Sequence, residues 1–177
     1  EADLSQEQLD KLTEMLAYAP TGVNAPSVHL SLVATRRKMD EIRQITYDCL
    51  KTVRADSPLF IIKEMAEASS KVGKDLVYRG APALVAASVD TKTAASVCQT
   101  VDPVIALSYL ELYAASLGLG TVWDGIAVAL AREFPEIEAQ FQIPQGCKLS
   151  FLMALGIPDI SYQRTPQRTT DRITIIR

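Results

Sequence analysis

The N-terminal part of the chain carries apolar residues at helical spacing. Ser5 is a suitable N-cap, and leucines recur after it at positions 9, 12 and 16. The predicted helix runs to about Tyr18 and ends before Pro20, because a proline disfavours helical geometry at the residue before it. Apolar residues return at the same spacing over residues 38–53, which predicts a second helix.

Other segments are predicted to be strands, because their apolar residues alternate or form short continuous runs. Residues 28–34 alternate loosely, and residues 81–89 form an apolar run of strand length. Residues 149–155 give another buried strand, and residues 121–125 a short strand or turn. The tail segment 173–176, Ile-Thr-Ile-Ile, is strand-like and too apolar to remain in solvent.

The most apolar helix is predicted after Asp102-Pro103. Nearly every residue of the range 104–117 is apolar or aromatic, and the polar breaks are Ser108, Glu111 and Ser116. A helix that is apolar all round is buried on all sides. We therefore expect this helix at the centre of the domain or of a dimer interface.

Further helices are predicted after Ser57-Pro58 and over residues 127–134. Strands and helices thus alternate along the chain, which favours a sheet that is covered by helices on both faces. The predicted fold is α+β with an α/β-like, three-layer arrangement. The length of 177 residues fits one domain over residues 1–177.

The composition argues against several classes of partner. The net charge of −3 gives no electrostatic attraction to nucleic acid or to an anionic membrane. No apolar run approaches the roughly 20 residues that span a bilayer. The three cysteines are far apart and odd in number, which favours reduced thiols and a cytoplasmic location.

Several common catalytic chemistries lack their residues. His29 is the one histidine, so we expect no histidine cluster and no metal site. The chain has neither a G-x-S-x-G elbow nor a phosphate-binding loop with its lysine. We therefore expect no catalytic side-chain set.

Three segments are candidates for ligand binding, each with a plain structural alternative. The loop 18–24, Tyr-Ala-Pro-Thr-Gly-Val-Asn, offers polar groups beside a sharp turn, although it would also serve as a simple connection. Residues 117–125 combine glycines with Trp123, which would equally suit a helix end with a core tryptophan. Arginines of the tail, chiefly Arg164 and Arg168, suit an anion such as phosphate or a solvated tail.

The order of these segments resembles the nitroreductase family, and most closely the branch that is often fused to an iron–sulfur ferredoxin module. The motifs are Y-A-P-T-G-x-N (18–24), G-A-P (80–82), D-P-x-I-A-L-S-Y (102–109), S-L-G-L-G-T-V-W (116–123) and L-G-x-P (155–158). The resemblance implies a mixed sheet wrapped by helices and a homodimer with FMN at its interface. It also implies that residues 164–177 form a C-terminal extension that packs on the partner subunit.

The resemblance assigns the flavin contacts by position. The loop positions that match contacts to the flavin and its ribityl chain are Pro20, Thr21, Gly22 and Asn24. The positions that match the backbone N–H groups facing the flavin N5 and O4 edge are Trp123, Asp124 and Gly125. Arg164 and Arg168 match the basic residues that hold the FMN phosphate.

The implied activity is transfer of electrons from NAD(P)H to a nitroaromatic, quinone or similar small acceptor in a ping-pong cycle. Two features depart from the family pattern. The sequence begins after the place where the family's basic R-R-S-x-R segment, which grips the FMN phosphate, would stand, and Ala25 stands where the family often has a glutamine. The alternative is a non-catalytic flavin-binding or regulatory protein that has lost part of the phosphate site.

Overall fold

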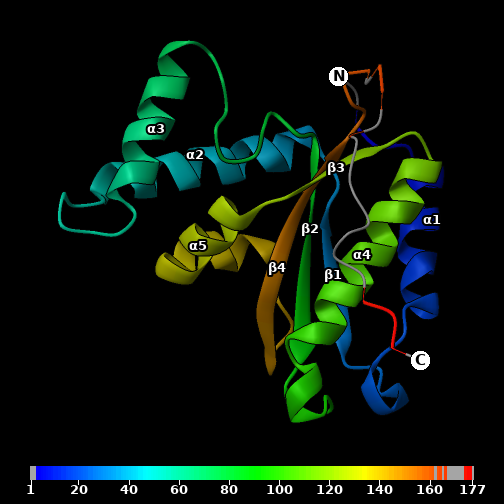
Figure 1. Ribbon diagram of the computed structural model, residues 1–177. Coiled ribbons are helices and arrows are strands. Elements are labelled where there is room, and N and C mark those ends of the chain that lie inside the picture. Colours follow the sequence, from blue (N-terminus) through cyan, green and yellow to red (C-terminus); the bar gives the residue numbers. More distant parts are fainter. Residues whose placement is uncertain (1–2, 162, 165, 167–173, 177) are drawn as a thin grey trace.

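The computed structural model of the chain describes residues 3–161, 163–164, 166 and 174–176. A four-stranded sheet forms the middle layer, and helices cover both of its faces (Figure 1). The strands are β1 (Val28–Val33), β2 (Ala83–Asp90), β3 (Gly120–Trp123) and β4 (Cys147–Gly156), and they lie in the order β1-β2-β4-β3. The predicted α+β class and its three layers are confirmed.

Apart from the short α6, which was not predicted, the helices begin and end near the positions that the sequence predicted. They are α1 (Gln6–Glu14), α2 (Arg36–Thr52), α3 (Phe60–Lys71), α4 (Val101–Ser116), α5 (Gly125–Glu133) and α6 (Pro135–Glu138). A capping box between Ser5 and Gln8 begins α1, and the Thr35 side chain caps α2. Among the described residues, no helix is long and apolar enough to cross a membrane.

The expectation of a mixed sheet is wrong for the described strands, because every pairing between them is antiparallel. Since β2 and β3 both run antiparallel to β4, they point the same way, as strands joined by a helical crossover usually do. However, β4 lies between them. The alternation of strand and helix along the chain does not reveal this insertion.

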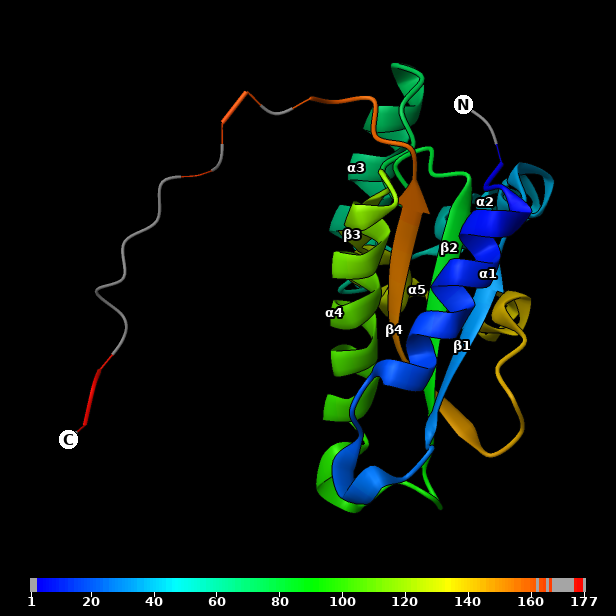
Figure 2. The ribbon, with the colours of Figure 1, turned by 90° about the vertical axis from the view of Figure 1, so that its right-hand side faces the viewer.

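Strand β2 contributes to both hydrophobic layers through its alternating side chains. Ala83, Val85 and Ala87 pack with α1 and α4, whereas Leu84 and Ala86 pack with α2, α5 and α6. Figure 2 shows α1 and α4 against the sheet, seen from a second direction. Burial on both faces explains why β2 is a continuous apolar run rather than an alternating one.

Helix α4 is buried on one face only within the single chain. The buried face includes Leu107, Leu110 and Ala114, which pack on the sheet. The opposite face exposes large apolar side chains, and Leu112 retains 74% of its accessible surface. The helix therefore does not lie at the centre of the domain. A second surface would have to cover the exposed face for the helix to be buried on all sides, as its apolar composition predicts.

The apolar tail has no regular structure where it is described. Thr174–Ile176 form neither helix nor strand, and Ile176 is 92% exposed. Ile173 lies outside the described residues. The predicted burial of this segment is therefore not achieved within the chain.

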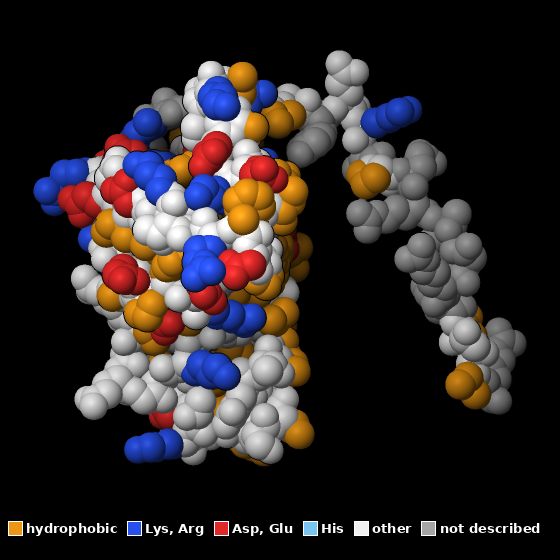
Figure 3. Space-filling model, turned by 90° about the vertical axis from the view of Figure 1, so that its left-hand side faces the viewer, with side chains coloured by type: hydrophobic (Ala, Val, Ile, Leu, Met, Phe, Trp, Pro, Cys, Tyr) orange, Lys and Arg blue, Asp and Glu red, His pale blue; other side chains and the backbone are white. Residues whose placement is uncertain are grey.

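Charged side chains of both signs are interspersed on the face that carries α2 and α3 (Figure 3). Some pair along α2, including Lys38 with Glu41 at 3.1 Å and Lys51 with Asp48 at 2.6 Å. Exposed pairs of this kind contribute about 0–1 kcal/mol each. This face therefore presents no basic field of the kind that attracts nucleic acid.

Candidate functional site

The loop 20–24 is fixed to the first turn of α4. The Gly22 N–H donates to both carboxylate oxygens of Asp102, at 3.1 and 3.0 Å, and Asp102 is buried. Val23 and Asn24 both have left-handed backbone conformations, with φ of 52° and 55°. A β-branched residue rarely adopts this conformation, so the loop is held in an unusual shape that exposes Val23 and Asn24 to solvent.

Gly22 is required by a close neighbour rather than by its own dihedral angles. A Cβ atom added at this position would overlap Sγ of Cys98, and Cβ of Cys98 would lie 2.9 Å away. The loop therefore lies directly against the short turn Ser96–Cys98 that precedes α4. The predicted polar segment and the start of α4 form one compact corner of the molecule.

The segment 123–125 lies where β3 leads into α5. The Trp123 ring donates from Nε1 to Oε2 of Glu111 at 2.9 Å, and its edge meets Phe151 with ring centroids 5.3 Å apart. Thr121 also donates its hydroxyl to Glu111, at 3.4 Å. Glu111 thus fixes the tryptophan against α4, and sequence reasoning had treated it only as a polar break in the helix.

Asp124 caps α5 and is buried. Its Oδ1 accepts from the Ala127 N–H at 2.9 Å, and its own N–H donates to the Leu152 carbonyl at 2.9 Å. Its Oδ2 is buried and has no hydrogen-bond partner among the described residues. Burial raises the pKa of Asp124 to about 6, against the hydrogen bond from Ala127, which lowers it.

These bonds refine the prediction that N–H groups of 123–125 serve a ligand. The Asp124 N–H is committed to β4, so it is not available. The Gly125 N–H lies at the first position of α5 and therefore has no acceptor within the helix. No atom lies within 4 Å of the place that a Gly125 Cβ would occupy, so there is open space on that side of the residue.

A cavity of about 520 Å³ lies at the end of the sheet where β3 begins, and none of the residues 123–125 lines it. Its walls come from the turn before β2, from α4, from the start of β3 and from the chain that leaves β4. The charged or hydroxyl-bearing residues in these walls are Arg79, Glu111, Thr121 and Asp159. Arg79 was not selected from the sequence, because no motif marks it.

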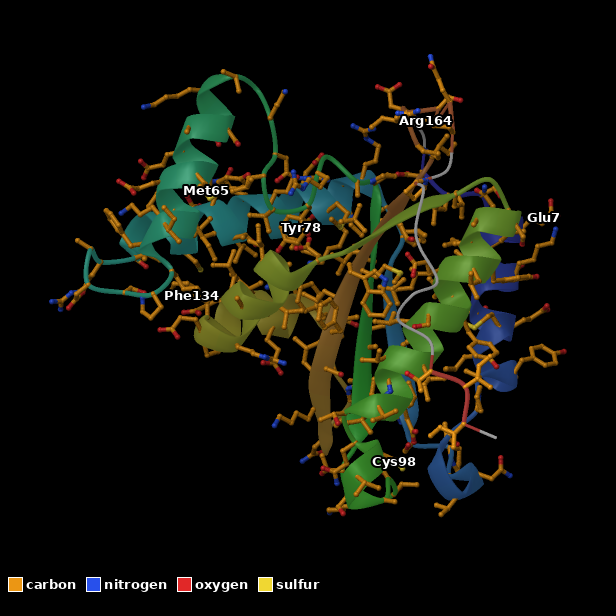
Figure 4. All side chains as sticks on the ribbon, viewed as in Figure 1. Glu7, Met65, Tyr78, Cys98, Phe134 and Arg164 are labelled. Carbon is orange, nitrogen blue, oxygen red and sulfur yellow. The ribbon has the colours of Figure 1, made fainter. Side chains whose placement is uncertain are left out.

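The predicted site residues do not all meet within one chain. Gly22 contacts Asp102, whereas Trp123 contacts Glu111, about 14 Å further along the α4 axis at 1.5 Å per residue. Figure 4 shows Cys98, which touches Gly22, and Arg164 at opposite ends of the molecule. Arg164 is exposed, and Arg168 lies outside the described residues.

The fold and the site define a three-layer α+β protein with a ligand-sized cavity at the end of its sheet. The sequence profile of the nitroreductase family matches residues 1–157, so the chain belongs to the nitroreductase family. Comparison with curated proteins gave no match.

Solved structures share the fold at low sequence identity. A nitroreductase with bound FMN from Bacteroides fragilis NCTC 9343 has a TM-score of 0.77 at 21% identity, covering 99% of this chain and 92% of that one. A nitroreductase with bound FMN from Desulfitobacterium hafniense DCB-2 has a TM-score of 0.72 at 21% identity, with coverages of 98% and 88%. A putative NADH dehydrogenase/NAD(P)H nitroreductase from Bacteroides thetaiotaomicron VPI-5482 has a TM-score of 0.65 at 16% identity, with coverages of 99% and 91%.

Proposed function

We propose that the chain is an FMN-dependent oxidoreductase that passes electrons from NAD(P)H to a nitroaromatic, a quinone or a similar small acceptor in a ping-pong cycle. Family membership supports this, as do the bound FMN in the B. fragilis and D. hafniense structures and the NAD(P)H in the name of the B. thetaiotaomicron protein. The observation that carries the proposal is the cavity of about 520 Å³, whose wall includes Gly120–Val122, the stretch of chain that leads to Gly125 at the start of α5.

The residues present fit a flavin nucleotide. A cavity of about 520 Å³ lies within the range of small-molecule sites, roughly 300–1,000 Å³. The Gly125 N–H supplies a hydrogen-bond donor at the positive end of α5. The buried Oδ2 of Asp124 can accept a hydrogen bond from a ligand or from water, which most buried polar atoms obtain.

Bound FMN would supply the redox chemistry, accepting a hydride equivalent and releasing electrons to the acceptor. The chain's own part is to bind and orient it. The Gly125 N–H and the α5 dipole favour negative charge at this position, and they need no reorganisation because α5 is packed against β4. The bond from the Asp124 N–H to Leu152 holds this donor in place. No acid or base from the chain is required.

The separation of the two predicted flavin segments is consistent with a homodimer. The exposed stripe of α4 includes Val101, Val104, Tyr109 and Leu112, and an isologous contact would pair this stripe with itself. If two α4 helices pack antiparallel, the first turn of one lies beside the last turns of the other. The loop 20–24 of one subunit would then approach the 123–125 segment of its partner, and one flavin would contact both.

The phosphate side of the proposed site involves the tail. Arg164 lies at the sheet end where β4 leaves the cavity (Figure 4), and Arg168 remains a proposed ligand outside the described residues. We also propose that residues 164–177 pack on the partner subunit. The exposure of Ile175 and Ile176 supports this, because two adjacent exposed isoleucines gain free energy when they are covered.

The proposal is tested by titrating the purified chain with FMN and following flavin fluorescence. We expect saturable binding and FMN-dependent oxidation of NADH or NADPH when a nitroaromatic or a quinone is present. Absence of FMN binding would refute the proposal. Binding without NAD(P)H oxidation would favour the alternative of a non-catalytic flavin-binding protein.

Two variants of Gly125 give a matched comparison for the donor. Gly125→Pro removes the N–H, and a proline is tolerated at the first helical position because no intrahelical bond is lost there. Gly125→Ala keeps the N–H, and its Cβ meets no atom within 4 Å. We expect the proline variant to lose turnover by about a hundredfold, the usual effect of removing one such donor, and the alanine variant to remain active. Equal activity in both variants would exclude a role for this N–H.

A further inference from the structure

The carboxylate of Asp75 is the centre of the turn between α3 and β2. It accepts hydrogen bonds at 2.9–3.1 Å from two side chains and three backbone N–H groups: Arg43 Nε, the Tyr47 hydroxyl, Val77, Tyr78 and Gly80. Arg43 also donates to the Ala81 carbonyl at the end of the turn. Burial alone would raise the pKa of Asp75, but the bonds from Arg43, Gly80 and Tyr78 outweigh it and hold the pKa below its ordinary value. The turn is therefore rigid and built around a charge.

This turn forces Arg79 into an unfavourable backbone conformation. Arg79 has φ of 57° and is followed by Gly80 with φ of 71°. Glycine adopts such angles without penalty, whereas an arginine does not. Residues held in this way by surrounding bonds are found disproportionately at binding sites. Nothing in the packing explains why an arginine stands here, because its side chain is exposed.

Arg79 lies in the wall of the cavity. Ile157–Ile160, the segment that leads from β4 towards Arg164, forms another part of that wall. Arg79 forms no ion pair within the part of the chain that the structure describes, although its positive charge acts on the buried Asp124 and opposes the rise of that pKa. Of the carboxylates in the wall, Glu111 already binds Trp123 and Thr121, and Asp159 is exposed to solvent. An exposed guanidinium at the mouth of a ligand-sized cavity suits an anion that stays partly hydrated.

We propose that Arg79 binds the phosphate group of the flavin nucleotide at the mouth of this cavity. The proposal rests on the proposed function. It assigns to the turn before β2 a part of the phosphate site that sequence reasoning placed only on Arg164 and Arg168. The unfavourable backbone of Arg79 is then the structural consequence of presenting a fixed cation towards the cavity.

The test compares FMN with riboflavin, which has the same ring but no phosphate. Arg79→Asn removes the cation, and asparagine tolerates positive φ better than most residues, so we expect the fold and the Tm to be kept. Loss of one charge-assisted contact weakens FMN binding by about tenfold or more, with riboflavin affinity unchanged. Arg79→Lys, which keeps a point charge, restores part of the FMN affinity. Dissociation constants from flavin fluorescence give each value without any turnover.

Arg54→Asn is the matched control, because Arg54 is also exposed and lies in the loop between α2 and α3, paired with Asp56. It makes the same change in charge, and we expect no change in either affinity. An unchanged ratio of FMN to riboflavin affinity in Arg79→Asn would overturn the proposal. Equal weakening for both ligands would place Arg79 on the ring instead and would also overturn it. Failure of the unaltered chain to bind either ligand would refute the proposed function itself.

Discussion

Replacing Asp124 by asparagine measures the cost of burying a carboxylate at the start of α5. The asparagine has the same shape, remains a good N-cap for the Ala127 N–H and cannot ionise. In the native protein the carboxyl is 4% exposed, and burial raises its pKa to about 6 from an ordinary value of 3.8. The folded state therefore holds its proton over a range in which the unfolded chain has lost it.

The sign of the effect follows from that shift. The favourable contribution of the neutral carboxyl is fully present below the unfolded pKa and is lost as the pH rises through the folded pKa. A shift of about two pKa units corresponds to about 3 kcal/mol at 1.36 kcal/mol per unit. The asparagine variant should thus be more stable than the native chain by up to about 3 kcal/mol near pH 8. The difference should fall below about 1 kcal/mol near pH 4.

Urea denaturation of both proteins, followed by circular dichroism at several pH values without added flavin, measures this difference. Asp124→Ala is the control, because it also removes the charge but loses the cap, which costs about 1 kcal/mol at every pH. A difference between Asp124→Asn and the native chain that does not vary with pH would refute the reasoning. So would an asparagine variant that is less stable near pH 8.

Three further substitutions address the core, the proposed interface and the loop. Leu107→Ala, in the buried face of α4, should lower the free energy of unfolding by about 2–5 kcal/mol, whereas Ile61→Ala on the exposed side of α3 should change it by less than about 0.5 kcal/mol. Leu112→Asp should shift the protein from dimer to monomer in analytical ultracentrifugation, while Ile61→Asp on α3 should leave the dimer intact. A Leu112→Asp variant that is still a dimer would exclude this face of α4 as the dimer contact. Gly22→Ala should weaken FMN binding, because the added Cβ would overlap Cys98. The double variant Gly22→Ala/Cys98→Gly should recover part of this loss. If the effects of the two substitutions on FMN affinity are additive, they do not act through this contact.

Much of the local structure was predictable because its causes are local. The capping box at Ser5, the helical spacing of leucines in α1 and the continuous apolar run of β2 each act over a few residues. They placed the described helices and strands to within a few positions. The assignment to the nitroreductase family came from the order of several motifs, and the profile match over residues 1–157 confirms it.

The candidate site was predictable only in part. The segments 20–24 and 123–125 were selected by motif, yet the commitment of the Asp124 N–H to Leu152 depends on a strand that comes later in the chain. Arg79 and Glu111 carried no sequence signal, because an arginine before Gly80 or a glutamate in a helix is common. Only the cavity wall and the bonds around Asp75 set Arg79 apart.

The sequence alone determined the periodicity of each element, the caps and turns between them, and the absence of a histidine cluster or nucleophile motif. The tertiary structure decided that β4 lies between β2 and β3, that one face of α4 remains exposed, and that the two predicted flavin segments lie far apart along α4. The physical reason is range. Periodicity and capping depend on neighbours within a few residues, whereas strand order and the meeting of side chains depend on contacts between residues that are distant in the chain.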